Sequence, residues 1–287
     1  MRNFTEDSLT DAVVDRLQSC ADARTREVLV SAVRHLHAFV REARPTQAEW
    51  SAAIVFLTAT GQKCDSTRQE FILLSDTLGV SMLVDAINHP PREDATDSTV
   101  LGPFFVEEAP ELSSGADISN GADGDTLLCE GQVLGPAGDP IADAVVDVWQ
   151  SDAEGFYDVQ KAGRGDYHLR GRFRTDAAGR FRFWSIVPSS YPIPTDGPVG
   201  KLLATAGRHP FRPAHVHFMI RAPRHAGLVT HLFIEGDPYL DSDVVFGVKD
   251  SLIKTLERRT PHQASGLGYT TTKDHLVLSH TFRLPQA

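Results

Sequence analysis

Apolar residues recur every three or four positions from about residue 6 to residue 90. Leu9, Val13 and Leu17 illustrate this spacing, which places them on one stripe of an α-helix. A second helix is predicted from about residue 23 to residue 42, ending before Pro45. The first part of the chain is therefore expected to be helical.

Two capping patterns predict where further helices begin. Thr46 with Glu49, and Ser66 with Gln69, have the spacing of a capping box, in which each side chain bonds the other residue's backbone N–H. The first two predicted helices carry more apolar residues than a single helical hairpin can bury. We expect them to pack against the rest of the chain or against a second subunit.

After residue 125 the period changes to two, which is typical of β-strands. The segment Arg180–Trp184 alternates between polar and apolar residues, and turn sequences such as that at 176–179 separate the apolar runs. One helix is expected among the strands, from about Ser242 to Leu256, opened by the polar cluster at 241–243. The pattern predicts an antiparallel sandwich or barrel-like core with seven strands, at residues 127–134, 144–149, 167–175, 180–186, 215–221, 229–234 and 275–282.

Prolines and glycines become frequent between about residues 89 and 124, which indicates a linker or an extended loop. Its one apolar segment, residues 100–106, is expected to fill a packing gap or to line a pocket. The predicted fold class is therefore α+β. An N-terminal helical region covers residues 1–95, with a linker to about residue 125, and a mainly-β sandwich domain covers residues 96–287.

Composition narrows the classes of function. The formal net charge of −10 argues against general nucleic-acid binding, which needs a basic face. Cys20, Cys64 and Cys129 form neither a C-x-x-C metal motif nor a disulfide framework, as is typical of the reducing cytoplasm. No apolar run is long enough for a membrane span, and the N-terminal residues lack the pattern of a signal peptide. We expect a soluble cytoplasmic protein.

The segment RPAHVHF, residues 212–218, carries the strongest candidate chemistry. Because side chains alternate along a strand, His215 and His217 point to the same face and can bind one metal ion. Arg212 lies just upstream as a fixed positive charge. The same pair is equally compatible with two hydrogen-bonded core histidines.

Tyr157 and Tyr191 lie in expected turns, where a phenol commonly caps the turn. A phenol has a pKa of about 10, but a bound trivalent cation can hold it as a phenolate, which is a donor suited to Fe(III). Two phenolates and two imidazoles would leave coordination positions open on such an ion. The residues alone leave both interpretations open.

Several short segments, taken in order, resemble the signature blocks of the intradiol ring-cleaving dioxygenases, the catechol 1,2-dioxygenase family. They are LGPF (101–104), VWQ (148–150) with GFY (155–157), SIVP (185–188) with YP (191–192), GRH (207–209) with RPAHVHF (212–218), and GDPY (236–239). The resemblance covers nearly the whole chain, and the joint spacing of two tyrosines, an arginine and His-x-His is specific. Three further segments resemble the hydroxyquinol 1,2-dioxygenase branch most: FILLSD (71–76), YPIP (191–194), and TH (230–231) with YLDSD (239–243).

The resemblance implies a role for each candidate residue. Arg212 matches the arginine that stabilises negative charge developing on the substrate ring. Tyr191 matches a ligand that leaves the metal as it accepts a substrate proton. His231 falls where catechol-specific relatives carry Gln, near the face that reacts with oxygen, and is a further catalytic candidate. One non-haem Fe(III) per subunit is expected, held by Tyr157, Tyr191, His215 and His217.

The resemblance also implies a substrate pocket. Asp76 is its one polar wall residue and is expected to accept a hydrogen bond from an additional ring hydroxyl, although without the family context a helix-surface carboxylate is the simpler interpretation. Leu101 stands where hydroxyquinol relatives often carry Phe, which implies a roomier pocket. The expected walls are Leu73, Asp76, Val100, Leu101, Gly102, Pro103, Phe104, Ile193, Pro194 and Val245.

The implied activity is cleavage of hydroxyquinol (1,2,4-trihydroxybenzene) by O2 between its two vicinal hydroxylated carbons. The product would be 3-hydroxy-cis,cis-muconate, which tautomerises to maleylacetate. Catechol or a chlorocatechol is the alternative substrate. The family also implies a homodimer joined through the N-terminal helices, enclosing a phospholipid. From the charge and the apolar runs described above, no nucleic-acid or membrane partner is expected.

Two other classes of protein stay open from the residues. His-x-His on a strand also serves Fe(II) cupins and zinc hydrolases, which need a further His or carboxylate ligand. The non-enzymatic alternative is a transthyretin-like β-sandwich that acts as a binding module. The cluster of Arg212, His215 and His217 argues against that alternative.

Overall fold

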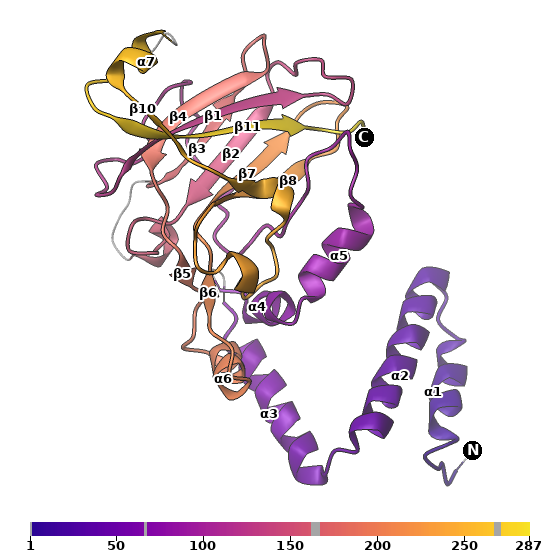
Figure 1. The fold of residues 1–287 in the computed structure, drawn as a ribbon. Coiled ribbons are helices and arrows are strands. Elements are labelled where there is room, and N and C mark those ends of the chain that lie inside the picture. The colour runs from indigo at the N-terminus through magenta and orange to yellow at the C-terminus, as the bar shows by residue number, and fades with distance from the viewer. Residues whose placement is uncertain (1, 66–67, 162–166, 267–270) are drawn as a thin grey trace. The chain divides into compact units, whose positions relative to one another are not determined.

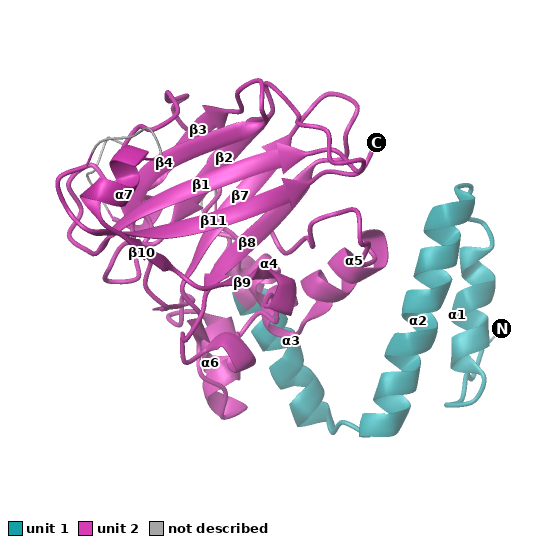
Figure 2. Cartoon of the chain, turned by 45° about the horizontal axis from the view of Figure 1, so that its top comes forward, with its two compact units in different colours: residues 1–59 teal, residues 60–287 magenta. Residues whose placement is uncertain are grey.

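The computed structural model describes residues 2–65, 68–161, 167–266 and 271–287. The chain divides into two compact units, residues 1–59 and 60–287 (Figure 2). The sequence predicted a different boundary, between a helical region (residues 1–95) and a β-sandwich domain (residues 96–287). That division into domains stays a prediction.

The first unit is helical, as the apolar spacing predicts. Its elements are α1 (Leu9–Leu17), α2 (Ala23–Ala43) and the greater part of α3 (Gln47–Gln62). The predicted capping box opens α3: the Thr46 backbone N–H donates to Glu49 Oε2 (2.7 Å), and the Glu49 N–H donates to Thr46 Oγ1 (3.2 Å). The second predicted box includes Ser66, which lies outside the described residues. The next helix, α4 (Glu70–Thr77), begins just after Gln69.

Helix α2 has no buried residue along its length. Its apolar side chains are far from covered, since Leu36 and Phe39 are 62% and 63% exposed. The predicted excess of apolar helix surface is therefore present in the first unit. Nothing within that unit buries it.

Two sheets form the β-sandwich of the second unit (Figure 1). One sheet has the strand order β10-β11-β1-β4, and the other has the order β3-β2-β7-β8-β9. β5 and β6 form a separate two-stranded ribbon. The strands are β1 (Thr126–Leu134), β2 (Val145–Gln150), β3 (Arg170–Arg174), β4 (Arg180–Ile186), β5 (Tyr191–Pro192), β6 (Phe211–Arg212), β7 (His215–Arg221), β8 (Leu228–Ile234), β9 (Ile253–Lys254), β10 (Glu257–Arg259) and β11 (His275–Arg283). All seven predicted strands are present, whereas the short β5, β6, β9 and β10 were not expected.

The hydrophobic core lies between the two sheets. Val216 and Phe218 of β7 face Phe181 and Phe183 of β4 across it, and Phe183 also stacks on Phe173 with ring centroids 5.1 Å apart. His215 and His217 occupy the alternate positions of β7, so they lie on the opposite face of the five-stranded sheet. The predicted α+β fold with a mainly-β sandwich is confirmed.

The remaining helices and the predicted linker surround the sandwich. The helices are α5 (Val80–Asn88), α6 (Pro198–Thr205) and α7 (Pro261–Gly266), and η1 (Asp158–Gln160) is a short 3-10 helix. The linker bonds to both sheets, because Leu112 N–H donates to Arg172 O of β3 and Ile118 N–H donates to Trp184 O of β4. It is therefore an extended segment that wraps the sandwich.

The helix predicted from about Ser242 to Leu256 is wrong. That stretch holds two short 3-10 turns, η2 (Leu240–Ser242) and η3 (Asp250–Leu252), followed by β9. The Asp243 carboxylate accepts from the backbone N–H groups of Val245 (3.3 Å) and Gly247 (2.9 Å). Phe246 has a φ of +60°, outside the right-handed helical region. Local side-chain-to-backbone bonds of this kind compete with a helix.

None of the described helices is both long and apolar enough to cross a membrane.

Candidate metal centre and active site

Strands β5, β6 and β7 and the loop before η1 bring the predicted tyrosines, histidines and arginine together. β7 supplies His215 and His217. β5 pairs with β6 so that Tyr191 lies directly opposite Arg212. Tyr157 comes from the loop before η1, where its backbone N–H donates to Gln160 Oε1 (2.9 Å). All five side chains are buried.

A glycine lets the two tyrosine-bearing segments approach each other. Gly155 has a φ of +84°, and a Cβ atom there would lie 2.9 Å from the Cβ of Tyr191. Only glycine suits both the backbone angle and the contact. The ring of Tyr157 is then held by Phe104, which stacks on it with centroids 4.4 Å apart.

Four donor atoms converge on one point. Tyr157 Oη lies 2.9 Å from His217 Nε2, 3.3 Å from Tyr191 Oη and 3.5 Å from His215 Nε2. The two Nε2 atoms are 3.0 Å apart. Ligand atoms bound at about 2.0–2.2 Å from a common ion lie roughly 3 Å from one another, so these distances suit a single metal ion.

Burial fixes the protonation states of these groups. It lowers the pKa of His215, His217 and His231 well below the usual range, with neighbouring positive groups adding to the effect, so all three imidazoles are neutral ligands or acceptors. Burial, followed by the neighbouring Tyr191, raises the pKa of Tyr157 well above its usual range. A phenolate at Tyr157 therefore needs a further positive charge beside it, which a bound metal ion supplies.

Different contacts hold the rings of His215 and His217 in place. His215 Nδ1 lies 2.7 Å from the carbonyl oxygen of Pro213, which assigns the proton to Nδ1 and leaves the Nε2 lone pair free for the centre. His217 is held by the indole of Trp149, which stacks on it with centroids 4.5 Å apart. Its Nδ1 has no hydrogen-bond partner among the described residues. Both rings are thus oriented with Nε2 toward the shared point.

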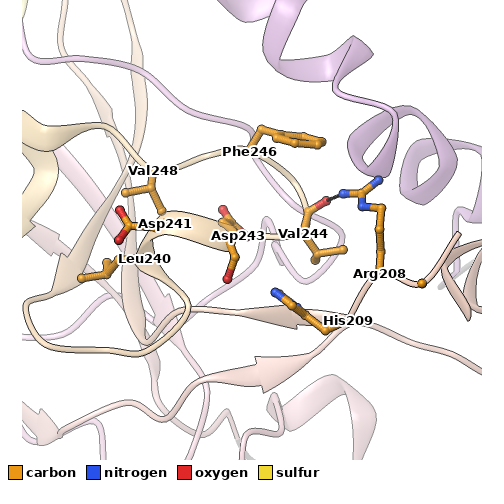
Figure 3. Close-up of a pocket in the computed structure, with 10 residues that line it drawn as sticks. Arg208, His209, Leu240, Asp241, Asp243, Val244, Phe246 and Val248 are labelled. Atoms are coloured by element: carbon orange, nitrogen blue, oxygen red, sulfur yellow. Dashed lines mark hydrogen bonds between the residues drawn. The ribbon is translucent and has the colours of Figure 1, made fainter.

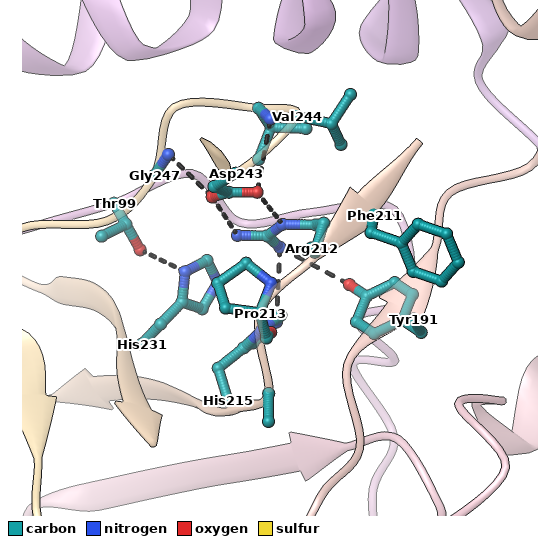
Figure 4. Close-up of polar contacts among 12 residues, drawn as sticks. Thr99, Tyr191, Phe211, Arg212, Pro213, His215, His231, Asp243, Val244 and Gly247 are labelled. Atoms are coloured by element: carbon teal, nitrogen blue, oxygen red, sulfur yellow. Dashed lines mark hydrogen bonds and ion pairs between the residues drawn. The ribbon is translucent and has the colours of Figure 1, made fainter. Parts of the chain in front are cut away.

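His231 of β8 lies in the same cluster. It is paired with His217 across the sheet, and ligand nitrogens of His215, His217 and His231 all lie within 4.8 Å of one another. Its Nδ1 is 2.9 Å from Thr99 Oγ1, while its buried Nε2 has no partner in the described part of the chain (Figure 4). The cluster therefore contains a third imidazole besides the two expected as ligands.

Arg212 forms a buried ion pair with Asp243 beside the donor atoms (Figure 4). Its Nη1 lies 3.3 Å from His215 Nε2 and 3.5 Å from Tyr191 Oη. Burial opposes the charge on the guanidinium, but Asp243, Tyr191 and Tyr157 together outweigh this effect and the pKa of Arg212 is raised. A permanent positive charge is therefore fixed at the edge of the centre.

A narrow pocket opens beside Tyr191 and Arg212. Leu101 is not among its lining residues, and its side chain is 40% exposed. Asp76, expected at a helix surface without the family context, is 3% exposed. Nine of the ten predicted wall residues line the pocket: Leu73, Asp76, Val100, Gly102, Pro103, Phe104, Ile193, Pro194 and Val245.

The sequence did not point to several residues that shape the site. Trp149 stands in a recognised block, but its stacking on His217 follows only from the pairing of β2 with β7. Thr99 lies in the linker, more than a hundred residues before its partner His231. Asp243 has the sequence pattern of a helix cap, which concealed its pairing with Arg212. A contact between segments that are far apart in the chain leaves no periodic pattern in the local sequence, so the sequence does not predict it.

The fold and the site define a β-sandwich protein with a buried tyrosine and histidine cluster that is compatible with a non-haem metal ion. Two known protein families match the chain and are consistent with this class of protein. The family described as "Dioxygenase" matches residues 100–278, and that described as "Catechol dioxygenase N terminus" matches residues 22–96. The chain belongs to the intradiol ring-cleaving dioxygenase family, and it is an enzyme.

Individual relatives cover nearly the whole chain. A 6-chlorohydroxyquinol 1,2-dioxygenase of Cupriavidus pinatubonensis is 54% identical over 260 residues, covering 91% of this chain and 94% of the relative. A hydroxyquinol 1,2-dioxygenase of Rhodococcus opacus is 53% identical over 257 residues, covering 89% and 85%. The crystal structure of a hydroxyquinol 1,2-dioxygenase from Pseudomonas putida DLL-E4 superposes with a TM-score of 0.92 at 48% identity, covering 98% and 99%.

Proposed function

We propose that this enzyme is a hydroxyquinol 1,2-dioxygenase that uses one Fe(III) ion per subunit. It would cleave 1,2,4-trihydroxybenzene with O2 between the vicinal hydroxylated carbons to give 3-hydroxy-cis,cis-muconate, the tautomer of maleylacetate. One observation carries the proposal. Two phenols and two imidazoles converge beside a pocket that is lined by both Arg212 and Asp76, in a chain of this family.

The donor set supports ferric iron as the metal. Tyr157 and Tyr191 would bind as hard phenolate donors, and His215 and His217 would bind through Nε2. When bound, Fe(III) supplies a Lewis acid that holds the vicinal oxygens of the substrate and makes its ring reactive toward O2. His231 lies in the same cluster as a neutral imidazole whose Nε2 has no partner among the described residues, and we assign it to the side where O2 reacts.

Two residues would handle charge and protons during the reaction. Tyr191 Oη, as a phenolate, would accept a proton from one substrate hydroxyl and then carry it as a neutral phenol. Arg212 Nη1, 3.5 Å from that oxygen, would stabilise negative charge as it develops on the ring and its oxygens. Because Arg212 is buried and already paired, its charge is in place before the substrate binds.

Asp76 would provide the preference for a third hydroxyl. It lies on α4 in the pocket wall, and burial raises the pKa of its carboxyl. A ring hydroxyl of the bound substrate would donate a hydrogen bond to this carboxylate. A site built to bond a hydroxyl discriminates strongly against an analogue that lacks it, because the buried carboxylate then loses that hydrogen bond.

The test combines colour, metal and substrate. Purified enzyme should contain about one iron per chain and absorb visible light through phenolate-to-iron charge transfer. Oxygen uptake should be fastest with hydroxyquinol, with 6-chlorohydroxyquinol, catechol and chlorocatechols measured beside it. A protein that stays colourless with added iron would exclude the metal centre, and a coloured enzyme that prefers catechol or a chlorocatechol would exclude the proposed substrate.

We also propose a homodimer joined through the N-terminal helices, with a phospholipid held between them. The exposed apolar side chains of α2, such as Leu36 and Phe39, support this, because apolar surface of this extent marks an interaction site. A cytoplasmic location is proposed as well and is supported by three free cysteines. Sedimentation equilibrium and mass spectrometry of an organic extract test the dimer and the lipid, and a lipid-free monomer would exclude both.

A further inference from the structure

The guanidinium of Arg212 is held with one edge away from the metal centre. Its Nε lies 3.2 Å from Asp243 Oδ1, and its Nη2 lies 3.4 Å from Oδ2. Only Nη1 is turned toward Tyr191 Oη and His215 Nε2 (Figure 4). A guanidinium is planar, so when a carboxylate binds its Nε and Nη2 edge the direction of the remaining Nη1 group is fixed.

The Asp243 carboxylate is itself fixed by backbone N–H groups of residues that follow it in the chain. Oδ1 accepts from the N–H of Val245 and Oδ2 accepts from the N–H of Gly247. The next residues are tied down too, since Arg208 Nη2 donates to Val244 O (2.9 Å) and its guanidinium lies 5.0 Å from the ring centroid of Phe246. The carboxylate therefore has a preset orientation before it meets Arg212.

The packing at Gly247 makes this arrangement sensitive to small changes. A Cβ atom at that position would lie 3.1 Å from Arg212 Nη2 and 3.2 Å from Asp243 Oδ2, tighter than most Cβ contacts. On its outer side Asp243 lines a surface cavity of about 530 Å³, together with His209 and Phe246 (Figure 3). Arg212 lines the inner pocket instead, so the ion pair forms part of the wall between the two spaces.

We propose that Asp243 is the positioning residue of Arg212. It holds Nη1 of the arginine toward the reacting oxygen atoms and keeps the guanidinium out of the outer cavity. The inference rests on the proposed function, since it takes the charge of Arg212 to act on the substrate. Asp243 makes none of the contacts described among the donor atoms, so we assign its effect on the reaction to the arginine.

A double-mutant cycle on kcat tests this. Asp243→Asn keeps the shape of the side chain and removes its charge, and it should lower kcat by about ten- to hundredfold, because misplacement of a catalytic group by about 1 Å has effects of this size. In an Arg212→Gln background the same change should alter kcat by less than about twofold. If the two effects multiply instead, Asp243 acts independently of Arg212 and the proposal is wrong.

The visible spectrum of the substrate-free ferric enzyme gives a second readout that does not depend on turnover. Asp243→Asn should shift the charge-transfer band, because it changes the charge and position of the guanidinium beside the Tyr191 oxygen. The shift should vanish in the Arg212→Gln background. A shift that persists without the arginine would overturn the proposal.

Asp147 offers a matched control. It is an equally buried aspartate that pairs with Arg172 and Arg221 and makes none of the contacts of the metal centre described above. Asp147→Asn should lower the unfolding temperature and leave both the band and kcat nearly unchanged. An equal loss of kcat in both aspartate variants would reduce Asp243 to a structural residue.

Gly247→Ala keeps the test decisive if Asp243→Asn does not fold. It changes no charge but pushes the ion pair apart, so it should lower kcat severalfold with iron content retained, and only when Arg212 is present. A fully active Gly247→Ala enzyme would contradict the proposal.

The parent enzyme distinguishes failure of the proposed function from failure of the role of Asp243. If the parent lacks iron and consumes no O2, the proposed function itself is wrong. If the parent is active but the double-mutant cycle shows no coupling, only the role of Asp243 is wrong.

Discussion

The β-sandwich and helix α2 differ in how much of their apolar surface is buried. Phe183 and Phe218 of the sandwich are 0% and 2% exposed, whereas Leu36 and Phe39 of α2 are 62% and 63% exposed. The sandwich completes its core from both of its own sheets, and it builds the site on the outer face of one of them. Helix α1 packs on one face of α2, but Leu36 and Phe39 stay exposed within their own unit. The sandwich therefore carries both the buried core and the site, whereas α2 leaves large apolar side chains exposed, which is the basis of the dimer proposed above.

Removal of one donor oxygen should separate the chemistry of the sandwich from its stability. Tyr157→Phe keeps the ring that stacks on Phe104 and deletes only the hydroxyl. We expect iron content to fall and kcat to drop by about a thousandfold or more, as for loss of a central catalytic group. Metal analysis and oxygen uptake measure the loss, and calorimetry of the metal-free protein should show nearly unchanged unfolding. Full iron occupancy with normal turnover would show that Tyr157 is not a ligand.

A cavity in the core should affect stability most. Phe183 is fully buried between the sheets and stacks on Phe173. Phe183→Ala should lower the free energy of unfolding by about 3–5 kcal/mol, the usual cost of such a truncation in a packed core. Urea unfolding followed by far-UV circular dichroism measures the change. A loss below 1 kcal/mol would mean that the core is not closed at this point.

Acid should weaken the sandwich through His280. Burial, with a contribution from Lys254, lowers the pKa of His280 to about 4, compared with about 6.5 in an unfolded chain. Its contribution to stability is therefore complete above pH 6.5 and is lost as the pH falls toward 4, because the unfolded chain takes up the proton first. His280→Gln should remove on the order of 2 kcal/mol of the acid sensitivity between pH 7.5 and 4.5. The metal-free proteins are compared by urea unfolding, and parallel pH profiles would contradict the assignment.

Asp76 should control the choice among ring substrates. Asp76→Ala removes the carboxylate of the pocket wall and should reduce the preference in kcat/KM for hydroxyquinol over catechol by about ten- to hundredfold. Steady-state oxygen uptake with both substrates gives the ratio. Leu101→Ala is the matched control, since Leu101 is outside the pocket lining and should leave the ratio unchanged. An unaltered ratio in Asp76→Ala would dismiss its role in specificity.

Polar substitution on α2 should have the smallest effect on stability. Leu36→Ser with Phe39→Ser changes two exposed positions, so the free energy of unfolding of the monomer should move by less than about 1 kcal/mol. The oligomeric state should change instead, from dimer to monomer, as measured by sedimentation velocity. If the dimer persists unchanged, α2 does not contribute to the interface.

The extent of prediction from sequence differs between the elements. The seven longer strands follow from alternation, and His215 and His217 share a face for the same reason. β5 and β6 have only two residues each, too short for any period, yet they set Tyr191 opposite Arg212. Tyr157 and Tyr191 could be singled out as candidates from the residues, but their convergence on the two histidines was available only through resemblance to a family.

The prediction of a helix over residues 242–256 was wrong for a physical reason. Asp243 satisfies a local capping pattern, but its carboxylate is engaged by a buried arginine about thirty residues away and by the turn that follows it. Leu101 shows a related limit. It was expected beside Val100 and Gly102 in the pocket wall, but its neighbours face the pocket and its own side chain is 40% exposed. Sequence pattern does not reveal which alternate residue of a loop turns inward.

The parallel pairing of β1 with β11 has a consequence for how the chain folds. It joins residues about 150 positions apart, and β11 is an interior strand of its sheet. One edge of β1 therefore has no partner until nearly all of the described chain has left the ribosome. Closing so long a loop costs entropy before any contact forms. We expect the sandwich to assemble slowly and only after synthesis, with nascent chains that depend on chaperones to keep the open edge of β1 from pairing with other chains.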